Sequence, residues 1–279
     1  MTTLADYRAR ALPVTSTVVG EAGKPWVVLF NTIGIPRAIF GTLMSYLTSD
    51  FSVLVWDTRY LPSANAVAGD ADFSTEAHVA DACALLADLG IEEFIGVGWC
   101  ASVDMMMKVS DTGLFRMRAA CSLNGAFVFD DRPDLASAWE ASVEPVFRIA
   151  AANRGSLAGI WSIITELEDL TEAAAVREET RFPFLSEESL YRYARLCLGA
   201  KESRSISSLP STEMPVLFLA GNRDAVQPFQ ASEQAHLRSP GSEFAVVDGG
   251  THGMFGYRND VCARIRQFCL DAAVLPVGR

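Results

Sequence analysis

One cysteine stands where a buried strand is expected to turn sharply into a helix. Cys100 is the middle residue of the segment 98–102, Gly-Trp-Cys-Ala-Ser, which follows the apolar run 94–97 and precedes the apolar, methionine-rich run 103–109. A nucleophile at a strand-to-helix bend has this pattern, although serine is the usual residue there. A thiolate attacks an acyl carbon far better than a thiol does, and a helix N-terminus favours its negative charge. The segment therefore predicts a cysteine nucleophile.

A histidine and an aspartate follow later strands in the order that such a nucleophile needs. His252 lies in Gly-Gly-Thr-His-Gly after the last predicted strand, and Asp224 ends Gly-Asn-Arg-Asp after the strand before it. A carboxylate beside an imidazole holds the tautomer that faces the nucleophile. We therefore expect a catalytic triad of Cys100, Asp224 and His252.

Some of these assignments have competitors in the sequence. Asp130 or Asp131, which follow another predicted strand, could replace the acid, and Ser102 could be the nucleophile, although it is expected inside the helix. The two other histidines, His78 and His236, fall on the faces of predicted helices, where a solvated or structural role is expected.

Acyl transfer also requires N–H groups that stabilise a developing oxyanion. The backbone amide of Ala101 is one candidate. The other is expected from the loop after the apolar run 26–30, where we choose Ile33 by position, with Thr32 as the near alternative. Thr32 and Trp99 are candidates for the wall of the substrate pocket.

The elements that would position these residues alternate along the chain. The runs 26–30, 51–56, 94–97, 117–123, 214–220 and 243–247 are apolar and strand-like, and 13–20 has the alternation of an edge strand. Helical patterns separate most of the apolar runs. This alternation predicts a parallel sheet with right-handed crossovers, covered by helices on both faces. Catalytic groups collect at the carboxyl ends of the strands in such sheets.

Strand patterns disappear between residues 130 and 208, where apolar residues recur at helical spacing. We expect one domain with a core of 1–129 and 209–279, interrupted by a helical lid insertion at 130–208. A lid over the carboxyl edge of the sheet would shape the substrate pocket. A purely structural helical layer is the alternative.

Composition narrows the classes of partner. The net charge of −11 argues against a nucleic-acid surface, which needs clustered lysine and arginine. No stretch approaches the ~20 apolar residues of a membrane span, and residues 1–17 do not resemble a signal peptide. The six cysteines follow no metal-ligand spacing. We expect a cytoplasmic protein with no metal, no cofactor and a small-molecule substrate; the sequence indicates no oligomeric state.

The segment 98–102, Asp224 and His252 together make the chain resemble the α/β-hydrolases over nearly its whole length outside the lid. The segment Asp57-Thr58-Arg59 also resembles one that many members carry. The resemblance implies an α/β-hydrolase fold, in which a mostly parallel central sheet is flanked by helices. Dienelactone hydrolases are similar in having a Cys-His-Asp set, but they usually carry glycine where Ser102 stands and lack a long helical lid.

A cysteine nucleophile would form a thioester intermediate, which stays reactive toward amines, thiols and alkoxides. We therefore expect a thioesterase or acyltransferase acting on a small to medium acyl ester or thioester, which could be bound to a carrier protein. An ester or lactone hydrolase with the same triad is the first alternative. A non-catalytic ligand-binding protein on the same fold is the second, in which Cys100 would be inert.

Overall fold

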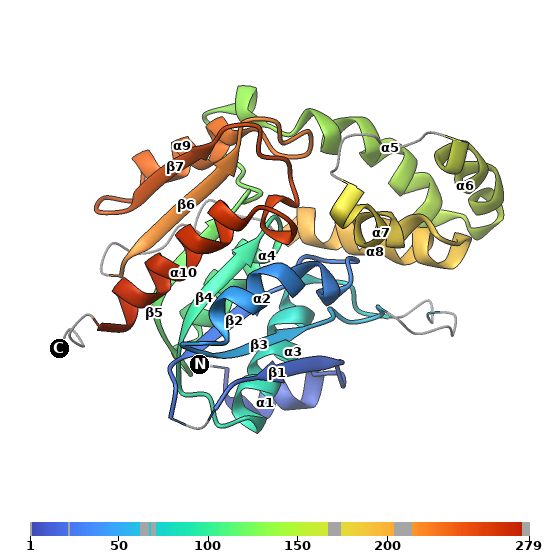
Figure 1. Ribbon diagram of the computed structural model, residues 1–279. Coiled ribbons are helices and arrows are strands. Elements are labelled where there is room, and N and C mark those ends of the chain that lie inside the picture. The colour runs from blue at the N-terminus through green and yellow to red at the C-terminus, as the bar shows by residue number, and fades with distance from the viewer. Residues whose placement is uncertain are drawn as a thin grey trace.

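The protein is built around one twisted sheet of seven strands (Figure 1). The computed structural model describes residues 2–21, 23–61, 67, 71–166, 174–203 and 214–274. The strands are β1 (Ser16–Val19), β2 (Trp26–Phe30), β3 (Ser52–Trp56), β4 (Glu93–Trp99), β5 (Arg116–Leu123), β6 (Val216–Gly221) and β7 (Glu243–Val247). Their order is β1-β3-β2-β4-β5-β6-β7; β1 pairs antiparallel with β3, and all other neighbours are parallel. The predicted mostly parallel sheet is confirmed.

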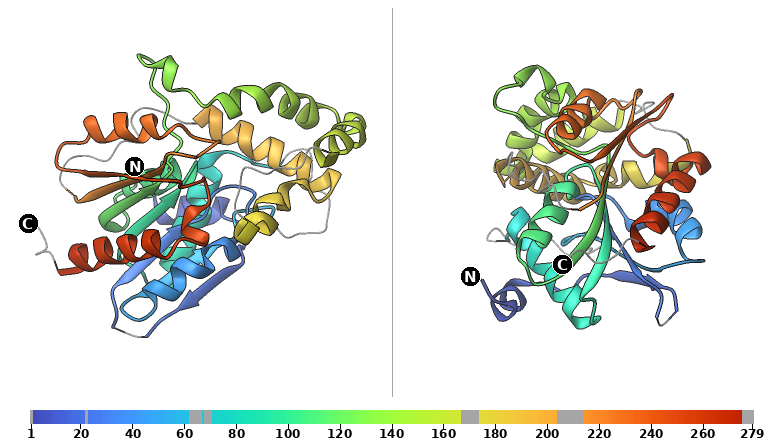
Figure 2. Two further views of the ribbon diagram at one scale, coloured as in Figure 1. Left: turned by 45° about the horizontal axis from the view of Figure 1, so that its top comes forward. Right: turned by 90° about the vertical axis from the view of Figure 1, so that its left-hand side faces the viewer.

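Helices cover both faces of this sheet (Figure 2). On one face, α2 (Gly41–Leu47) and α10 (Asn259–Val274) pack on an apolar cluster that contains Leu29, Val97 and Leu219. On the other, α3 (Thr75–Asp88), α4 (Ser102–Asp111) and α9 (Phe229–Leu237) pack on a second cluster. Strands buried on both faces are continuous apolar runs, which is why β2, β3 and β4 are recognisable in the sequence. Helix α1 (Leu4–Arg10), which the sequence analysis did not predict, packs against α3.

The chain between β5 and β6 is helical and extends beyond the carboxyl end of the sheet (Figure 1). It contains α5 (Ala138–Ala152), α6 (Leu157–Glu166), α7 (Arg177–Arg181) and α8 (Glu187–Ser203). Short 3-10 helices occur in this segment at Pro133–Leu135, Arg154–Ser156, Ala174–Val176 and Phe182–Phe184. Two others lie elsewhere in the chain, at Arg37–Phe40 and Met254–Gly256. Helices α5, α6 and α8 have an apolar cluster of their own, which includes Phe147, Leu157 and Leu190. The boundary expected between residues 208 and 209 lies outside the described residues.

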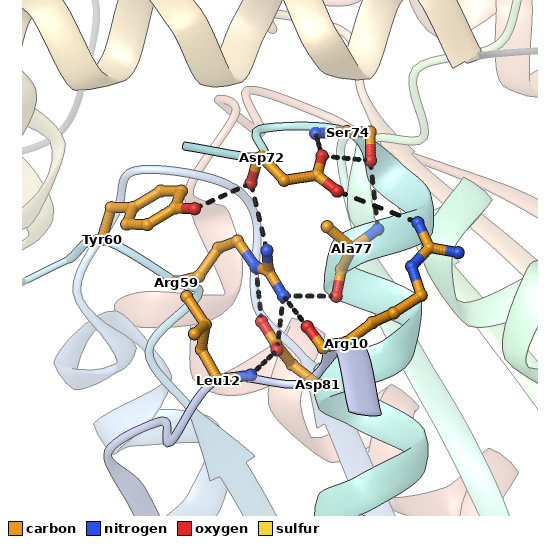
Figure 3. Close-up of polar contacts among 8 residues, drawn as sticks. All are labelled: Arg10, Leu12, Arg59, Tyr60, Asp72, Ser74, Ala77 and Asp81. Atoms are coloured by element: carbon orange, nitrogen blue, oxygen red, sulfur yellow. Dashed lines mark hydrogen bonds and ion pairs between the residues drawn. The ribbon is translucent and has the colours of Figure 1, made fainter. Parts of the chain in front are cut away.

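A buried ion pair fixes the loop that follows β3 (Figure 3). The Arg59 guanidinium donates two hydrogen bonds to Asp81 on α3, at 2.8 and 2.7 Å, and both side chains are almost fully buried. Its N–H groups also reach the carbonyl oxygens of Asp72 and Ala77, at 3.1 and 2.9 Å. Asp81 in turn accepts the backbone N–H of Leu12. The pair thus joins the β3 loop to α3 and to the chain after α1.

We predict that Asp81→Asn lowers the free energy of unfolding by about 3 to 5 kcal/mol, because it leaves the buried Arg59 charge without a counter-charge. Asp88→Asn is the matched control. Asp88 also lies on α3 and pairs with an arginine, Arg8, but both of those side chains are at least half exposed. The control should cost at most about 1 kcal/mol. Urea unfolding measures both, and equal losses would contradict a dominant role for the buried pair.

Candidate active site

Cys100 occupies a strained backbone position between β4 and α4. Its φ of 56° lies in the left-handed region, which a residue other than glycine adopts only when its surroundings hold it there. The Cys100 N–H donates to the carbonyl of Leu123 at 3.0 Å, and its carbonyl accepts from Val103 and Ala126 at 3.3 and 3.2 Å. Gly98 lets α4 pack closely on the strand, because an added Cβ would lie only 3.1 Å from the Val103 Cα atom. The bend therefore projects the Cys100 side chain from the end of the strand.

Ser102 holds this bend together. Its hydroxyl oxygen accepts the Trp99 backbone N–H at 2.8 Å, and the hydroxyl donates to the Phe30 carbonyl at 2.5 Å. The side chain is 2% exposed and lies away from solvent. These bonds give a structural reason for serine at a position where glycine is common, and they argue against Ser102 as a nucleophile.

His252 and Asp224 meet at the ends of β7 and β6. His252 Nδ1 lies 2.8 Å from Asp224 Oδ2, and the other carboxylate oxygen accepts the backbone N–H groups of Val226 and Gln227 at 2.7 and 2.9 Å. Burial alone would lower the pKa of His252, but the Asp224 carboxylate and an interaction with the Cys100 side chain raise that pKa well above its ordinary value of 6.5. The structure thus brings the three predicted residues together.

The competing residues lie elsewhere. Asp131 is exposed and pairs with Arg238 at 2.6 Å, and Asp130 is exposed. His78 is buried in α3, where desolvation lowers its pKa to about 3, so it is neutral. His236 hydrogen-bonds to Ser242 at 2.7 Å and stacks on Phe244, at the amino-terminal end of β7. Their surroundings are those of structural or surface residues.

A cavity of about 190 Å³ lies over Cys100, between the sheet edge and the helices that follow β5; we call it the elbow cavity. Ile33, Thr32 and Ala101 line it on the core side. Within the described part of the chain, neither the Ile33 nor the Ala101 amide has a protein hydrogen-bond partner. Both amides are therefore available to a ligand oxygen.

The other walls of the elbow cavity are mainly apolar and come mostly from α5, α8 and the 3-10 helix at Phe182–Phe184. They include Val143, Phe147, Phe184, Tyr193 and Leu198. Glu144 and Lys201 also line the cavity, and they pair with each other. Glu140 on α5 accepts a hydrogen bond from Gln227 at 2.7 Å, which ties this helix to the loop that carries Asp224.

Trp99 contributes more to the support of the site than to its open surface. It is 1% exposed, and its indole N–H donates to the His252 carbonyl at 2.9 Å. Its ring packs against the imidazole at 5.2 Å and against Phe255 at 5.0 Å. Trp99 is nevertheless among the residues that line the elbow cavity.

Asn124, at the end of β5, is a positioning residue that the sequence analysis missed. Its Nδ2 donates to the carbonyls of Thr251 and His252 at 3.1 and 2.8 Å, and its Oδ1 accepts the Gly221 N–H at 2.8 Å. Its φ of 45° is left-handed, a conformation that asparagine tolerates. The only signal in the sequence is an Asn-Gly pair at the end of a strand, and such a pair is equally typical of an ordinary turn.

Among the described residues, no group of three or more histidine, cysteine, aspartate or glutamate side chains could hold a metal ion. No helix in that same part of the chain is long and apolar enough to cross a membrane.

Replacing Asn124 should release the His252 loop. We predict that Asn124→Gly, which preserves the left-handed backbone, lets the imidazole move away from Asp224, so that the pKa of His252 falls from its raised value toward 6.5. The chain has three histidines, so an NMR titration of their side chains resolves this shift.

Asn222→Ala is the matched control for that titration. Asn222 joins the same two loops on their exposed side, where it accepts the Gly249 N–H at 2.8 Å. The control should leave the pKa of His252 raised. An unchanged titration of His252 in Asn124→Gly would contradict the positioning role.

Comparison with known proteins identifies the fold of the chain. A family model described as TAP-like protein matches residues 184–274. An esterase from Thermogutta terrifontis is similar in structure over 93% of each chain, with a TM-score of 0.71 and 20% identity. A bromoperoxidase from Bacillus anthracis has a TM-score of 0.72 and 17% identity, over 92% of this chain and 94% of that one.

A putative ancestral haloalkane dehalogenase is similar over 94% of this chain and 96% of its own, with a TM-score of 0.75 and 14% identity. No curated protein matches the sequence significantly. Together with the seven-stranded, mostly parallel sheet, these neighbours show that the chain has the α/β-hydrolase fold that its motifs predicted.

Proposed function

We propose that this protein cleaves a small to medium, mostly apolar acyl ester or thioester through an acyl-enzyme on Cys100. The observation that carries the proposal is the contact of His252 with Asp224 on one side and with Cys100 on the other, at the floor of the elbow cavity. A fold alone does not determine an activity, so the proposal rests on this site.

The first half-reaction moves one proton and one acyl group. Because the pKa of His252 is raised, its Nε2 takes up the thiol proton before the sulphur attacks the acyl carbon, and the carbonyl oxygen then becomes an oxyanion. Collapse of this intermediate breaks the bond to the alcohol or thiol, which leaves with the proton held by His252. Asp224 keeps Nδ1 protonated and stabilises the imidazolium while it exists. In the second half-reaction, water attacks the thioester by the same route.

The oxyanion would bind between the backbone amides of Ile33 and Ala101. Both residues line the elbow cavity, as Cys100 does. A preorganised donor of this kind commonly lowers the barrier by about 3 to 4 kcal/mol. The Ala101 amide also lies at the start of α4, where the helix dipole favours negative charge.

The lining of the elbow cavity supports a neutral acyl group. Its walls are mainly apolar, and α5 and α8 contribute to them two carboxylates, Glu140 and Glu144, and one cation, Lys201. Because Lys201 is already paired with Glu144, an anionic substrate would find no free positive charge among these three. Helices α5 and α8, which form the walls, would then act as the lid.

Transfer of the acyl group to a second nucleophile is the other candidate. Cysteine in place of serine favours it, because a thioester intermediate reacts readily with amines and thiols. Esterases among the structural neighbours make hydrolysis the first proposal.

We predict that the parent protein hydrolyses short p-nitrophenyl esters or acyl thioesters, and that Cys100→Ala lowers kcat by about a thousandfold or more, because no acyl-enzyme can form. Cys100→Ser should also be impaired, since a hydroxyl needs a stronger base than a thiol. Cys83→Ala is the matched control, because that thiol projects from α3 into the buried core.

Release of chromophore or free thiol measures these rates, and added amines or alcohols separate transfer from hydrolysis. A product distribution that no acceptor alters would exclude transfer. Full activity in Cys100→Ala would refute the cysteine mechanism, and absence of turnover and of acylation with every donor would favour a ligand-binding protein.

A further inference from the structure

Tyr193, on α8, separates the elbow cavity from a second cavity. The second cavity has a volume of about 170 Å³, and we call it the outer cavity. It lies between the loops after β2 and β3 and the segment that leads into α8, and Gly34, Tyr60, Leu61, Phe182 and Leu196 are among its lining residues. Tyr193 is the one residue among the described linings that belongs to both cavities.

The ring of Tyr193 lies directly on the backbone of the loop that carries Ile33. A Cβ atom added to Gly34 would lie 2.4 Å from Tyr193 Cδ2, so the ring occupies the space that any side chain at Gly34 would need. The left-handed φ of 72° at Gly34 independently requires glycine. Phe147 and Phe184, which line the elbow cavity, hold the Tyr193 ring in place, since their rings meet it edge-on at 5.5 and 5.6 Å.

The outer cavity is suited to hydrocarbon. Its apolar lining includes Leu61, Phe182 and Leu196, and its two charged residues neutralise each other, since Arg192 Nε donates to Glu188 at 2.9 Å. Burial raises the pKa of the Tyr193 hydroxyl well above its ordinary value, so the wall between the cavities carries no charge.

We propose that Tyr193 sets the upper limit on substrate chain length, and that the outer cavity is a closed-off subsite for the distal part of a longer acyl chain. This inference rests on the proposed function for its reaction, but the geometry of the wall is independent of it. The substrate of the parent protein is accordingly a short acyl ester or thioester that fits the elbow cavity alone. A chain too long for the elbow cavity would have to displace the Tyr193 ring to enter the outer cavity.

The test is the ratio of kcat/KM for p-nitrophenyl octanoate to that for p-nitrophenyl butanoate. Tyr193→Ala joins the cavities and should raise this ratio by about tenfold or more, because the added methylenes gain an apolar surface. Tyr193→Phe keeps the ring and should keep the parent ratio. Tyr193→Leu, which disturbs the fold less than alanine, should give an intermediate ratio.

Refilling the outer cavity distinguishes a subsite from a general loosening of the lid. Ser189 lines only the outer cavity of the two, so Tyr193→Ala combined with Ser189→Phe should return the ratio toward that of the parent. An unchanged ratio in Tyr193→Ala, or a raised ratio that Ser189→Phe does not reduce, would overturn the inference.

Measurements of ester binding test the role of the Tyr193 wall without requiring that the protein catalyse the proposed reaction. Calorimetry with ethyl octanoate and ethyl butanoate, in a Cys100→Ala background, requires no turnover. A relative gain for octanoate on adding Tyr193→Ala would support the wall even if the parent protein cleaved no ester, in which case only the proposed function would fail. Equal relative affinities with and without Tyr193→Ala would overturn the wall whatever the activity.

Discussion

The candidate site depends on four parallel strands that end at one edge of the sheet, where His252 and Asp224 hydrogen-bond to each other. Cys100, Asn124, Asp224 and His252 follow β4, β5, β6 and β7, which are successive neighbours in the sheet. Parallel pairing places all their carboxyl ends together, so residues more than a hundred positions apart meet. The 2.8 Å contact between imidazole and carboxylate would be lost if one strand slipped in register.

Side chains at the ends of neighbouring strands stabilise this arrangement through hydrogen bonds. Asn124 ties the end of β6 to the His252 loop, and the Trp99 indole donates to the same His252 carbonyl. Ser102 braces the bend at Cys100 against β2. The candidate site is thus fixed by hydrogen bonds to backbone atoms, which position groups more firmly than contacts between flexible side chains.

The sequence was sufficient for the fold and for the three residues that meet, because both leave local signals. Buried parallel strands are apolar runs, and His252 lies in a glycine-rich loop directly after one of them. Residues such as Asn124 and Tyr193 leave no comparable signal. Asn124 acts through loops about a hundred residues further along the chain, and Tyr193 acts through a contact with Gly34 on a different element. Only tertiary structure brings these partners together, and the same holds for Ser102, whose role depends on the Phe30 carbonyl.

In the proposed mechanism, an acyl group is transferred to the Cys100 sulphur. The most direct measurement is mass spectrometry of the intact protein after acid quenching during turnover of an acyl thioester, followed by peptide mapping. We expect a mass increase equal to the acyl group, located on the peptide that contains Cys100 and removed by neutral hydroxylamine. An acyl group found on Ser102 or on another cysteine, or turnover that proceeds with Cys100 unmodified and alkylatable throughout, would contradict the account.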